Sequence, residues 1–162
     1  MNKQRALLLT LMLALCGVMI GAQAEAAELS DDLYSFQLMM DGEVYQFPMS
    51  YADFVAHGWV FSGDAEEPLR PDAYMVTDPF IKDGTKVYAT AFNLGLNTVP
   101  VSQCYLGGVK IDSYYMTDSI MEIVFPKGIA YGRATREDIE AAYGSASDVY
   151  DGGRYVKLTY EY

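Results

Sequence analysis

The chain contains one histidine, His57, and two cysteines, Cys16 and Cys104. A thiol-dependent enzyme would need Cys104 beside His57, because an imidazole base must activate the thiol. Cys104 lies in the apolar stretch 101–106, a context typical of a buried and inert thiol. His57 directly precedes Gly58, where a polar ring interacts favourably with the end of a short predicted helix. We therefore expect a non-catalytic protein and keep a Cys104–His57 enzyme as the alternative.

Metal and nucleotide sites lack their usual sequence patterns. One histidine and Cys104 cannot form a zinc site without carboxylates, and the chain contains no Asp-x-Asp-x-Asp-Gly calcium loop. Gly152-Gly153 is typical of a hairpin turn and does not precede a helix as a phosphate-binding loop would. Neighbouring acids such as Glu137-Asp138 do not by themselves indicate a glycosidase. We expect neither a metal nor a cofactor.

Tyrosines are the first candidates for a binding surface, since the chain contains 14 of them. Tyrosine supplies a large apolar ring together with a polar end, which suits the centre of a protein interface. Tyr150, Tyr155 and Tyr160 fall on or beside the last predicted strands, near several acids. They support the hypothesis that the protein binds another protein, with a basic surface as the sharper form of that hypothesis.

A glycan-binding module, for example one that binds cell walls, is the alternative binding hypothesis. In it, Trp59 and the neighbours Tyr114 and Tyr115 would stack on sugar rings. Large aromatic side chains are more often buried than exposed. We therefore favour a core position for Trp59, in which it holds the first helix on the sheet.

The N-terminal 24 residues have the order of a secretory signal peptide. Lys3 and Arg5 precede an apolar run from Ala6 to Ile20, and Ala22-Gln23-Ala24 matches the small-residue cleavage site. We expect cleavage before Glu25 and secretion into the extracellular space or periplasm. The alternative is a membrane-anchored lipoprotein through Cys16, but the preceding Leu15 is larger than a lipoprotein peptidase accepts. The apolar run is also shorter than the about 20 residues that a membrane span requires.

Charge argues against nucleic acid as a partner. The chain has 11 basic and 22 acidic side chains, for a net charge of −11, and removal of Lys3 and Arg5 with the signal makes it more negative. Such a surface repels phosphate backbones and anionic lipids. The exported part keeps one cysteine, so its stability must come from a packed core.

Alternating apolar residues predict mostly β-strands in residues 25–162. Residues 34–40 and 44–47 flank Asp41-Gly42 and predict a hairpin, while 86–93, 121–125 and 156–162 predict three further strands. Gly107-Gly108 predicts a bulge within a strand. The stretch 62–71, rich in acids, Gly and Pro, predicts an exposed loop.

Two segments, near 50–58 and 135–143, predict short helices and resemble each other at a constant offset of 85 residues. Ser50 and Thr135 precede acids three positions later, the pattern of a capping box, and Gly58 and Gly144 are typical helix stops. Helices this short need tertiary packing. We expect an α+β fold, a mostly antiparallel sheet with two short helices packed on it. Two similar halves, 31–112 and 113–162, are one form of this fold; chance similarity between two capped helices is the other.

Two segments also resemble known exported proteins. Residues 126–147, PKGIAYGRATREDIEAAYGSAS, with Leu158-Thr159-Tyr160, resemble the GIxxGxTxxDVxxxYGxPS…LxY pattern of exported bacterial proteins similar to the β-lactamase-inhibitor-protein and small outer-membrane-assembly lipoprotein folds. Residues 41–59 resemble the DGxxYxLPxxxxxLxxxGW opening of uncharacterised secreted or lipoprotein families of gut-type bacteria. Ala146 replaces the usual proline of the first pattern. The resemblance implies a sheet-plus-helices architecture and interaction with proteins, although a fold does not fix a function.

Overall fold

The structure, a computed structural model, describes residues 28–111 and 121–161. The predicted signal peptide, Cys16, Tyr114 and Tyr115 lie outside these described residues, as does the predicted boundary between two halves after residue 112. None of the helices within residues 28–111 and 121–161 is long and apolar enough to cross a membrane.

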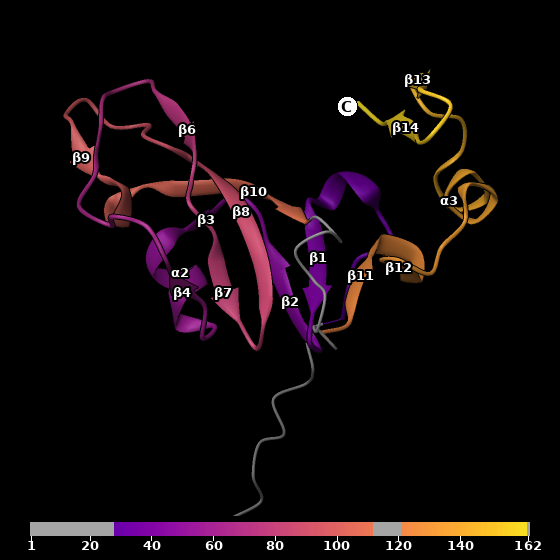
Figure 1. The fold of residues 1–162 in the computed structure, drawn as a ribbon, viewed down its shortest axis with the longest axis horizontal. Helices are drawn as coiled ribbons and strands as arrows, with labels where there is room; N and C mark the ends of the chain where they lie inside the picture. The colour runs from indigo at the N-terminus through magenta and orange to yellow at the C-terminus, as the bar shows by residue number, and fades with distance from the viewer. Residues whose placement is uncertain (1–27, 112–120, 162) are drawn as a thin grey trace, which may run out of the picture.

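Antiparallel strands dominate the fold, and the two predicted helices are present (Figure 1). Helix α2 spans Tyr51–Ala56 and helix α3 spans Arg136–Tyr143. Three short 3-10 helices complete the helical elements of the described residues: η1 (Leu33–Ser35), η2 (Val101–Gln103) and η4 (Pro126–Gly128). The predicted α+β class is therefore confirmed.

A four-stranded antiparallel sheet contains the predicted hairpin. Strands β1 (Gln37–Met40) and β2 (Glu43–Gln46) are joined at Asp41 and Gly42, whose φ angles of 54° and 77° give the left-handed turn that this pair of residues favours. The other two strands are β11 (Ile123–Phe125) and β12 (Ile129–Ala130), in the order β12-β11-β1-β2. Because β1 pairs with β11, the two predicted halves share this sheet.

The second sheet has six strands around the long central strand β8. Strand β10 pairs with one edge of β8, and its register shifts between Leu106 and Val109, which confirms the bulge predicted at Gly107-Gly108. Strands β6 and β7 pair in succession with the other edge. The members are β3 (Met49–Ser50), β4 (Val60–Phe61), β6 (Tyr74–Val76), β7 (Phe80–Lys82), β8 (Thr85–Phe92) and β10 (Tyr105–Ile111).

Two small antiparallel pairs complete the strands of the described residues. Strand β5 (Pro68–Leu69) pairs with β9 (Val99–Pro100), so the stretch predicted as an exposed loop contains a strand whose Leu69 is buried. Prolines and acids are typical of loops, but they do not indicate that a strand distant in sequence pairs with this stretch. Strands β13 (Asp148–Asp151) and β14 (Val156–Thr159) form the predicted C-terminal hairpin around Gly152-Gly153.

Both helices begin with the predicted caps. The Asp53 amide donates to the Ser50 hydroxyl at 3.0 Å, which satisfies one of the free donors at the start of α2. At α3 the capping box is complete, because the Asp138 amide donates to the Thr135 hydroxyl and the Thr135 amide donates to the Asp138 carboxylate. The hydrogen bonds that Asp138 accepts from the Thr135 amide and hydroxyl lower the pKa of its carboxyl.

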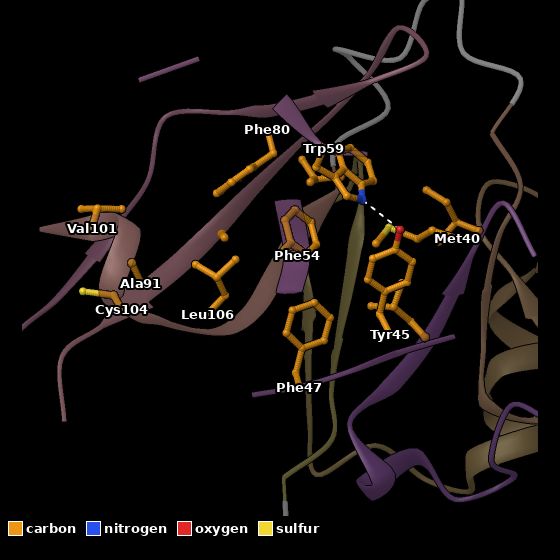
Figure 2. Packing of buried hydrophobic residues seen from close by; sticks show 14 of the residues in the cluster. Met40, Tyr45, Phe47, Phe54, Trp59, Phe80, Ala91, Val101, Cys104 and Leu106 are labelled. Carbon is orange, nitrogen blue, oxygen red and sulfur yellow. Dashed lines mark hydrogen bonds between the residues drawn. The ribbon is translucent and has the colours of Figure 1, made fainter. Parts of the chain in front are cut away.

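The hydrophobic core lies between α2, the β1–β2 hairpin and the inner face of the six-stranded sheet (Figure 2). The Phe54 ring stacks on Trp59 with ring centroids 5.3 Å apart and meets Phe80 edge-on at 5.0 Å. All three side chains are at most 1% exposed. This cluster packs α2 against the sheet and holds the helix in place.

Helix α3 packs differently from the expectation. Its apolar residue Ile139 is only half-buried, and every residue of α3, β13 and β14 is exposed or half-buried. The apolar stripe of α3 is present, but it faces an open groove (Figure 1 shows α3 and the hairpin beyond β12, to one side of the main body). The difference arises because no large sheet lies opposite this stripe within the described residues.

Candidate functional site

An apolar groove separates the C-terminal hairpin and α3 from the edge of the four-stranded sheet. Its volume is about 490 Å³, and it is open to solvent. Apolar and aromatic side chains make up most of its walls, which is the usual lining of a ligand-binding site. The lining residues are Leu33, Phe125, Ile129, Ala130, Tyr131, Gly132, Ala134, Arg136, Ile139, Tyr143, Val156, Leu158 and Tyr160.

Hydrogen bonds at the C-terminal end of α3 hold the near wall of the groove. The Tyr143 hydroxyl donates to the Pro126 carbonyl at 2.6 Å, so the last turn of α3 is tied to the start of η4. Burial raises the pKa of Tyr143 to about 12, so this donor keeps its proton at physiological pH. The Lys127 ammonium donates to the Ala142 carbonyl, one of the free acceptors at the C-terminal end of the helix.

The far wall is the β14 side of the hairpin, and Tyr160 attaches it to α3. The Tyr160 hydroxyl donates to the Gly144 carbonyl at 3.0 Å, and its ring meets the Tyr143 ring edge-on at 5.7 Å. The Tyr34 hydroxyl of η1 donates to the Glu161 carbonyl at 2.9 Å. These contacts give the groove a defined shape although little of it is buried.

One rim of the groove carries a cluster of charges around Arg136. The guanidinium donates to the Glu140 carboxylate through Nε at 2.9 Å and forms an ion pair with it through Nη2 at 2.8 Å. This pair is the main cause that raises the pKa of Arg136, and the charges of Glu137 and Asp151 raise it further. Within the described residues, Arg136 is the one charged side chain among those that line the groove.

The three tyrosines predicted as binding residues do not form one surface. Tyr160 lines the groove. Val156 and Leu158 also line it, so the alternation of a strand places Tyr155 on the opposite face of the hairpin. Tyr150 lies there too, with its ring centroid 5.8 Å from that of Tyr155, and both residues are more than half exposed.

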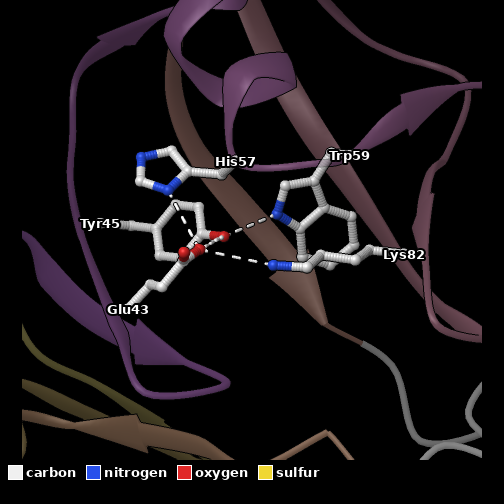
Figure 3. A network of polar contacts seen from close by, with 5 residues as sticks. All are labelled: Glu43, Tyr45, His57, Trp59 and Lys82. Atoms are coloured by element: carbon white, nitrogen blue, oxygen red, sulfur yellow. Dashed lines mark hydrogen bonds and ion pairs between the residues drawn. The ribbon is translucent and has the colours of Figure 1, made fainter.

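Trp59 is not a stacking platform for sugars, which corrects its place among the predicted binding residues. Its side chain is 1% exposed, and its indole N–H donates to the Tyr45 hydroxyl at 3.0 Å (Figure 3). Burial raises the pKa of Tyr45 to about 12. The favoured structural interpretation of Trp59, a core residue that packs on the first helix, is confirmed by its stacking on Phe54.

His57 belongs to a polar network at the surface of the core (Figure 3). Its Nδ1 lies 3.1 Å from the Glu43 carboxylate, which also accepts hydrogen bonds from the Lys82 ammonium at 3.4 Å and the Tyr45 hydroxyl at 3.3 Å. The hydrogen bond with His57 is the largest cause that lowers the pKa of Glu43. The network joins the β1–β2 hairpin, the end of α2 and β7, which is a structural role.

Cys104 lies at the opposite end of α2 from His57. The Tyr51 amide at the start of α2 donates to the Cys104 carbonyl, whereas His57 caps the end of this six-residue helix, about 9 Å further along its axis. The thiol is 2% exposed, donates to the Pro100 carbonyl, and has a pKa raised by burial. The structure therefore does not form the alternative Cys104–His57 pair. Within the described residues, no group of three His, Cys, Asp or Glu side chains could hold a metal ion.

The outer face of the six-stranded sheet is a second candidate surface. Tyr74, Phe92 and Tyr105 are direct partners in the register of β6, β8 and β10, so they form one row across three strands. The rings of Phe92 and Tyr105 are nearly parallel, at 25° and 6.1 Å. A Cβ at Gly107 would lie 2.9 Å from the Phe92 ring, so this glycine allows the ring to lie close to β10.

A shallow hollow of about 330 Å³ lies beside this aromatic row, and all of its lining residues are uncharged. The buried Asn93 side chain shapes the adjoining loop, because its amide donates to the Leu69 and Asn97 carbonyls and accepts from the Gly95 amide. The loop presents Leu96, which is 93% exposed. The aromatic row and this loop together expose a large uncharged surface.

Neither surface follows from the sequence pattern alone. The groove combines Leu33, the turn around Tyr131, α3 and β14, which are brought together by the pairing of β1 with β11. The sequence indicates two of the apolar walls of the groove. Val156, Leu158 and Tyr160 alternate along one strand, and α3 carries an apolar stripe. Phe92 and Tyr105 become neighbours only through the register of β8 and β10.

In comparisons with known proteins, no family model, no curated protein and no solved structure matches the chain.

Proposed function

We propose that this chain is an exported, non-catalytic module that binds another protein through the groove between α3, β12 and β14. The observation that carries the proposal is the groove itself, about 490 Å³ of open and mainly apolar space. Sites of this size and lining accommodate one or more large apolar side chains. Contact with a partner would remove this apolar surface from water at roughly 25 cal/mol per Å².

The C-terminal hairpin supports a protein as the ligand. Val149, Tyr150, Tyr155 and Val156 are all exposed on it. Among the described residues, β13 and β14 pair only with each other, so both outer strand edges are available for main-chain hydrogen bonds. A groove beside exposed aromatic side chains and free strand edges suits an interface with a protein segment.

Site-specific photo-crosslinking tests this function. A benzophenone amino acid at Val149, on the groove face of the hairpin, should give one product of defined mass with a protein from the producing cell's envelope or medium. Excess unlabelled protein should compete this product away, but its Ile139→Gln variant should not. The same photoprobe at Tyr74, also exposed but on β6, is the control. Absence of a product from position 149, or equal competition by the variant, would contradict the proposal.

A glycan is the second candidate ligand, and it would bind the outer face of the six-stranded sheet instead of the groove. The specific observation is the row of Tyr74, Phe92 and Tyr105 beside an uncharged hollow, since parallel aromatic rings on a flat sheet can stack on sugar rings. Soluble cell-wall polysaccharide, followed by calorimetry, should then bind the wild type and not Tyr105→Ala. Tyr150→Ala serves as the matched control on the hairpin.

Export and internal similarity are also proposals. We infer secretion after cleavage before Glu25 from the pattern of residues 1–24; the intact mass of the exported protein tests it, and a diacylglycerol adduct on Cys16 would instead make the protein a lipoprotein. The constant offset of 85 residues between the capped helices supports a repeat of similar helix-on-sheet units. The resemblance to inhibitor-like exported proteins agrees with protein binding and remains a proposal as well.

A further inference from the structure

We propose that the outer face of the six-stranded sheet binds a neutral, linear chain of β-linked hexopyranose units, laid across strands β6, β8 and β10. This inference rests on the glycan that is the second candidate ligand above, and it names the class of sugar. Its basis is the geometry of the aromatic row, Tyr74, Phe92 and Tyr105, together with the chemistry of the hollow beside it.

The aromatic row sets the direction and the length of the ligand. Its three residues are direct register partners on adjacent strands, so they follow one line across the sheet. Both ends of this line are open to solvent, since Tyr74 is 77% and Tyr105 is 48% exposed. Neighbouring strands lie about 4.8 Å apart, which is close to the length of one hexopyranose unit in an extended chain. The row therefore offers one aromatic ring to each of about three successive sugar units.

The orientation of the rings favours a flat and extended sugar chain. The rings of Phe92 and Tyr105 are nearly parallel, with 25° between their planes. Gly107 preserves this arrangement, because a Cβ there would lie 2.9 Å from the Phe92 ring. In a β-linked chain of glucose-type units the hydroxyls and the linkages are equatorial, so each unit has a face of C–H groups that packs on an aromatic ring. An α-linked chain curves and does not keep successive units on one line.

The hollow supplies uncharged hydrogen-bonding groups. It includes the exposed Gln103, whose amide can both donate to and accept from sugar hydroxyls. The amide of Asn93 is instead used within its own loop, where it donates to the Leu69 and Asn97 carbonyls. We therefore expect Gln103 to hold the sugar unit that lies next to the aromatic row.

Charge argues for a neutral ligand. Charged residues occur around this face of the sheet, but none of them lines the hollow. They include both signs, among them Lys86, Lys110, Arg70, Asp72, Glu66 and Glu67. The chain as a whole has a net charge of −11, which repels a polysaccharide that carries carboxylates or phosphates. Because the hollow contains no cation to offset this repulsion, an uncharged sugar chain fits it best.

Three hexasaccharides test this inference by isothermal titration calorimetry with the exported protein. Cellohexaose is neutral and β-linked, maltohexaose contains the same glucose units in α-linkage, and hexamannuronate is β-linked with a carboxylate on each unit. We expect saturable binding of cellohexaose that does not depend on salt, and at least about tenfold weaker binding of the other two. Cello-oligosaccharides shorter than about three units should bind more weakly, because they leave part of the aromatic row uncovered.

Two adjacent glycines provide a matched pair of variants. Gly107→Ala places a methyl group 2.9 Å from the Phe92 ring and should displace that ring, which weakens binding of cellohexaose about three- to tenfold. Gly108→Ala meets no atom within 4 Å and should change the affinity less than about twofold. Tyr105→Ala removes a ring outright and should weaken binding about tenfold, and Gln103→Ala should weaken it about fivefold through the loss of one hydrogen bond. Thermal unfolding verifies that each variant is folded, and Tyr105→Ala is sufficient for the test if Gly107→Ala is not.

The outcomes distinguish this inference from the proposed functions. If cellohexaose does not bind, or if maltohexaose or hexamannuronate binds as tightly, the inference fails. If cell-wall polysaccharide nevertheless binds through Tyr105, the sheet remains a glycan site for another class of sugar. If cellohexaose binds equally to the wild type and to Tyr105→Ala, it binds elsewhere and the inference fails.

A second copy of the chain is the other occupant that the experiment detects. If the exported protein sediments as a dimer that Tyr105→Ala dissociates, this face binds another copy and the inference fails. The groove is tested separately by the photoprobe at Val149, so none of these results decides whether the protein binds another protein there.

Discussion

Helix α2 and helix α3 begin with the same kind of cap, yet they lie in very different surroundings. Phe54 of α2 is fully buried among Trp59 and Phe80, whereas Ile139, at the equivalent place of α3, is half-buried at the wall of the groove. The local pattern of a cap and an apolar stripe sets where a helix forms. The strand pairing around it decides whether the stripe becomes core or binding surface.

The largest expected contrast between the two regions is in side-chain truncation. Phe54→Ala should lower the free energy of unfolding by about 3–5 kcal/mol, because it leaves a cavity in the aromatic cluster. Ile139→Ala should lower it by about 1 kcal/mol, because solvent already reaches this side chain. Denaturant unfolding of both variants checks the difference. Equal losses would mean that α3 is packed as tightly as α2.

A second contrast comes from the buried hydrogen bond of the core. Tyr45→Phe removes the acceptor of the Trp59 indole N–H and should destabilise the protein by about 1–2 kcal/mol. Tyr150→Phe, an exposed position on the hairpin, should leave stability within about 0.5 kcal/mol. Thermal unfolding measures both variants, and a shift in tryptophan fluorescence should accompany the first one only. A neutral Tyr45→Phe would show that this bond does not contribute to stability.

Removing the caps tests whether the two regions unfold together. Ser50→Ala and Thr135→Ala should each destabilise their own helix by about 1 kcal/mol. In α2 this loss should lower global stability, because the helix is part of the core. In α3 it should appear as about fivefold faster amide exchange of residues 136–143, with an unchanged unfolding midpoint. A midpoint lowered equally by both substitutions would mean that α3 belongs to the same cooperative unit.

The sequence is informative wherever the determining interactions are local. Asp41-Gly42, Gly152-Gly153 and the caps at Ser50 and Thr135 act within a few residues, and the structure confirms each of them. Leu69 shows the opposite case, since its burial depends on β9, which lies far along the chain, and a Pro-rich stretch does not reveal that pairing.

The candidate site is harder to predict than the fold for the same reason. Composition indicates Tyr160 as a binding residue, and it lines the groove, but Tyr150 and Tyr155 lie on the other face of the hairpin. The favoured interpretation places Trp59 in the core, and the structure adds its partner Tyr45, which no local pattern indicates. The groove, the aromatic row of the six-stranded sheet and the polar network around Glu43 all depend on strand register.

The smallest expected effect concerns pH and the surface network of the core. The Glu43 carboxyl has a pKa lowered mainly by its hydrogen bond with His57, so the ionised form is favoured in the folded state. Its contribution is present above the unfolded value of about 4.5 and is lost as pH falls through the lower folded value. Because Glu43 is half exposed, the contribution should stay below about 1 kcal/mol.

Comparison of the wild type with Glu43→Gln from pH 7 down to pH 3 checks this contribution. The difference in thermal midpoint should shrink as the pH falls below about 4.5, since both proteins then carry a neutral group at this position. Glu137→Gln, at an exposed position of α3, is the matched control and should leave the core midpoint unchanged at every pH. A Glu43→Gln difference that increases below about pH 4.5 would contradict the expected direction. An equal effect of Glu137→Gln would mean that the groove region and the core unfold as one cooperative unit.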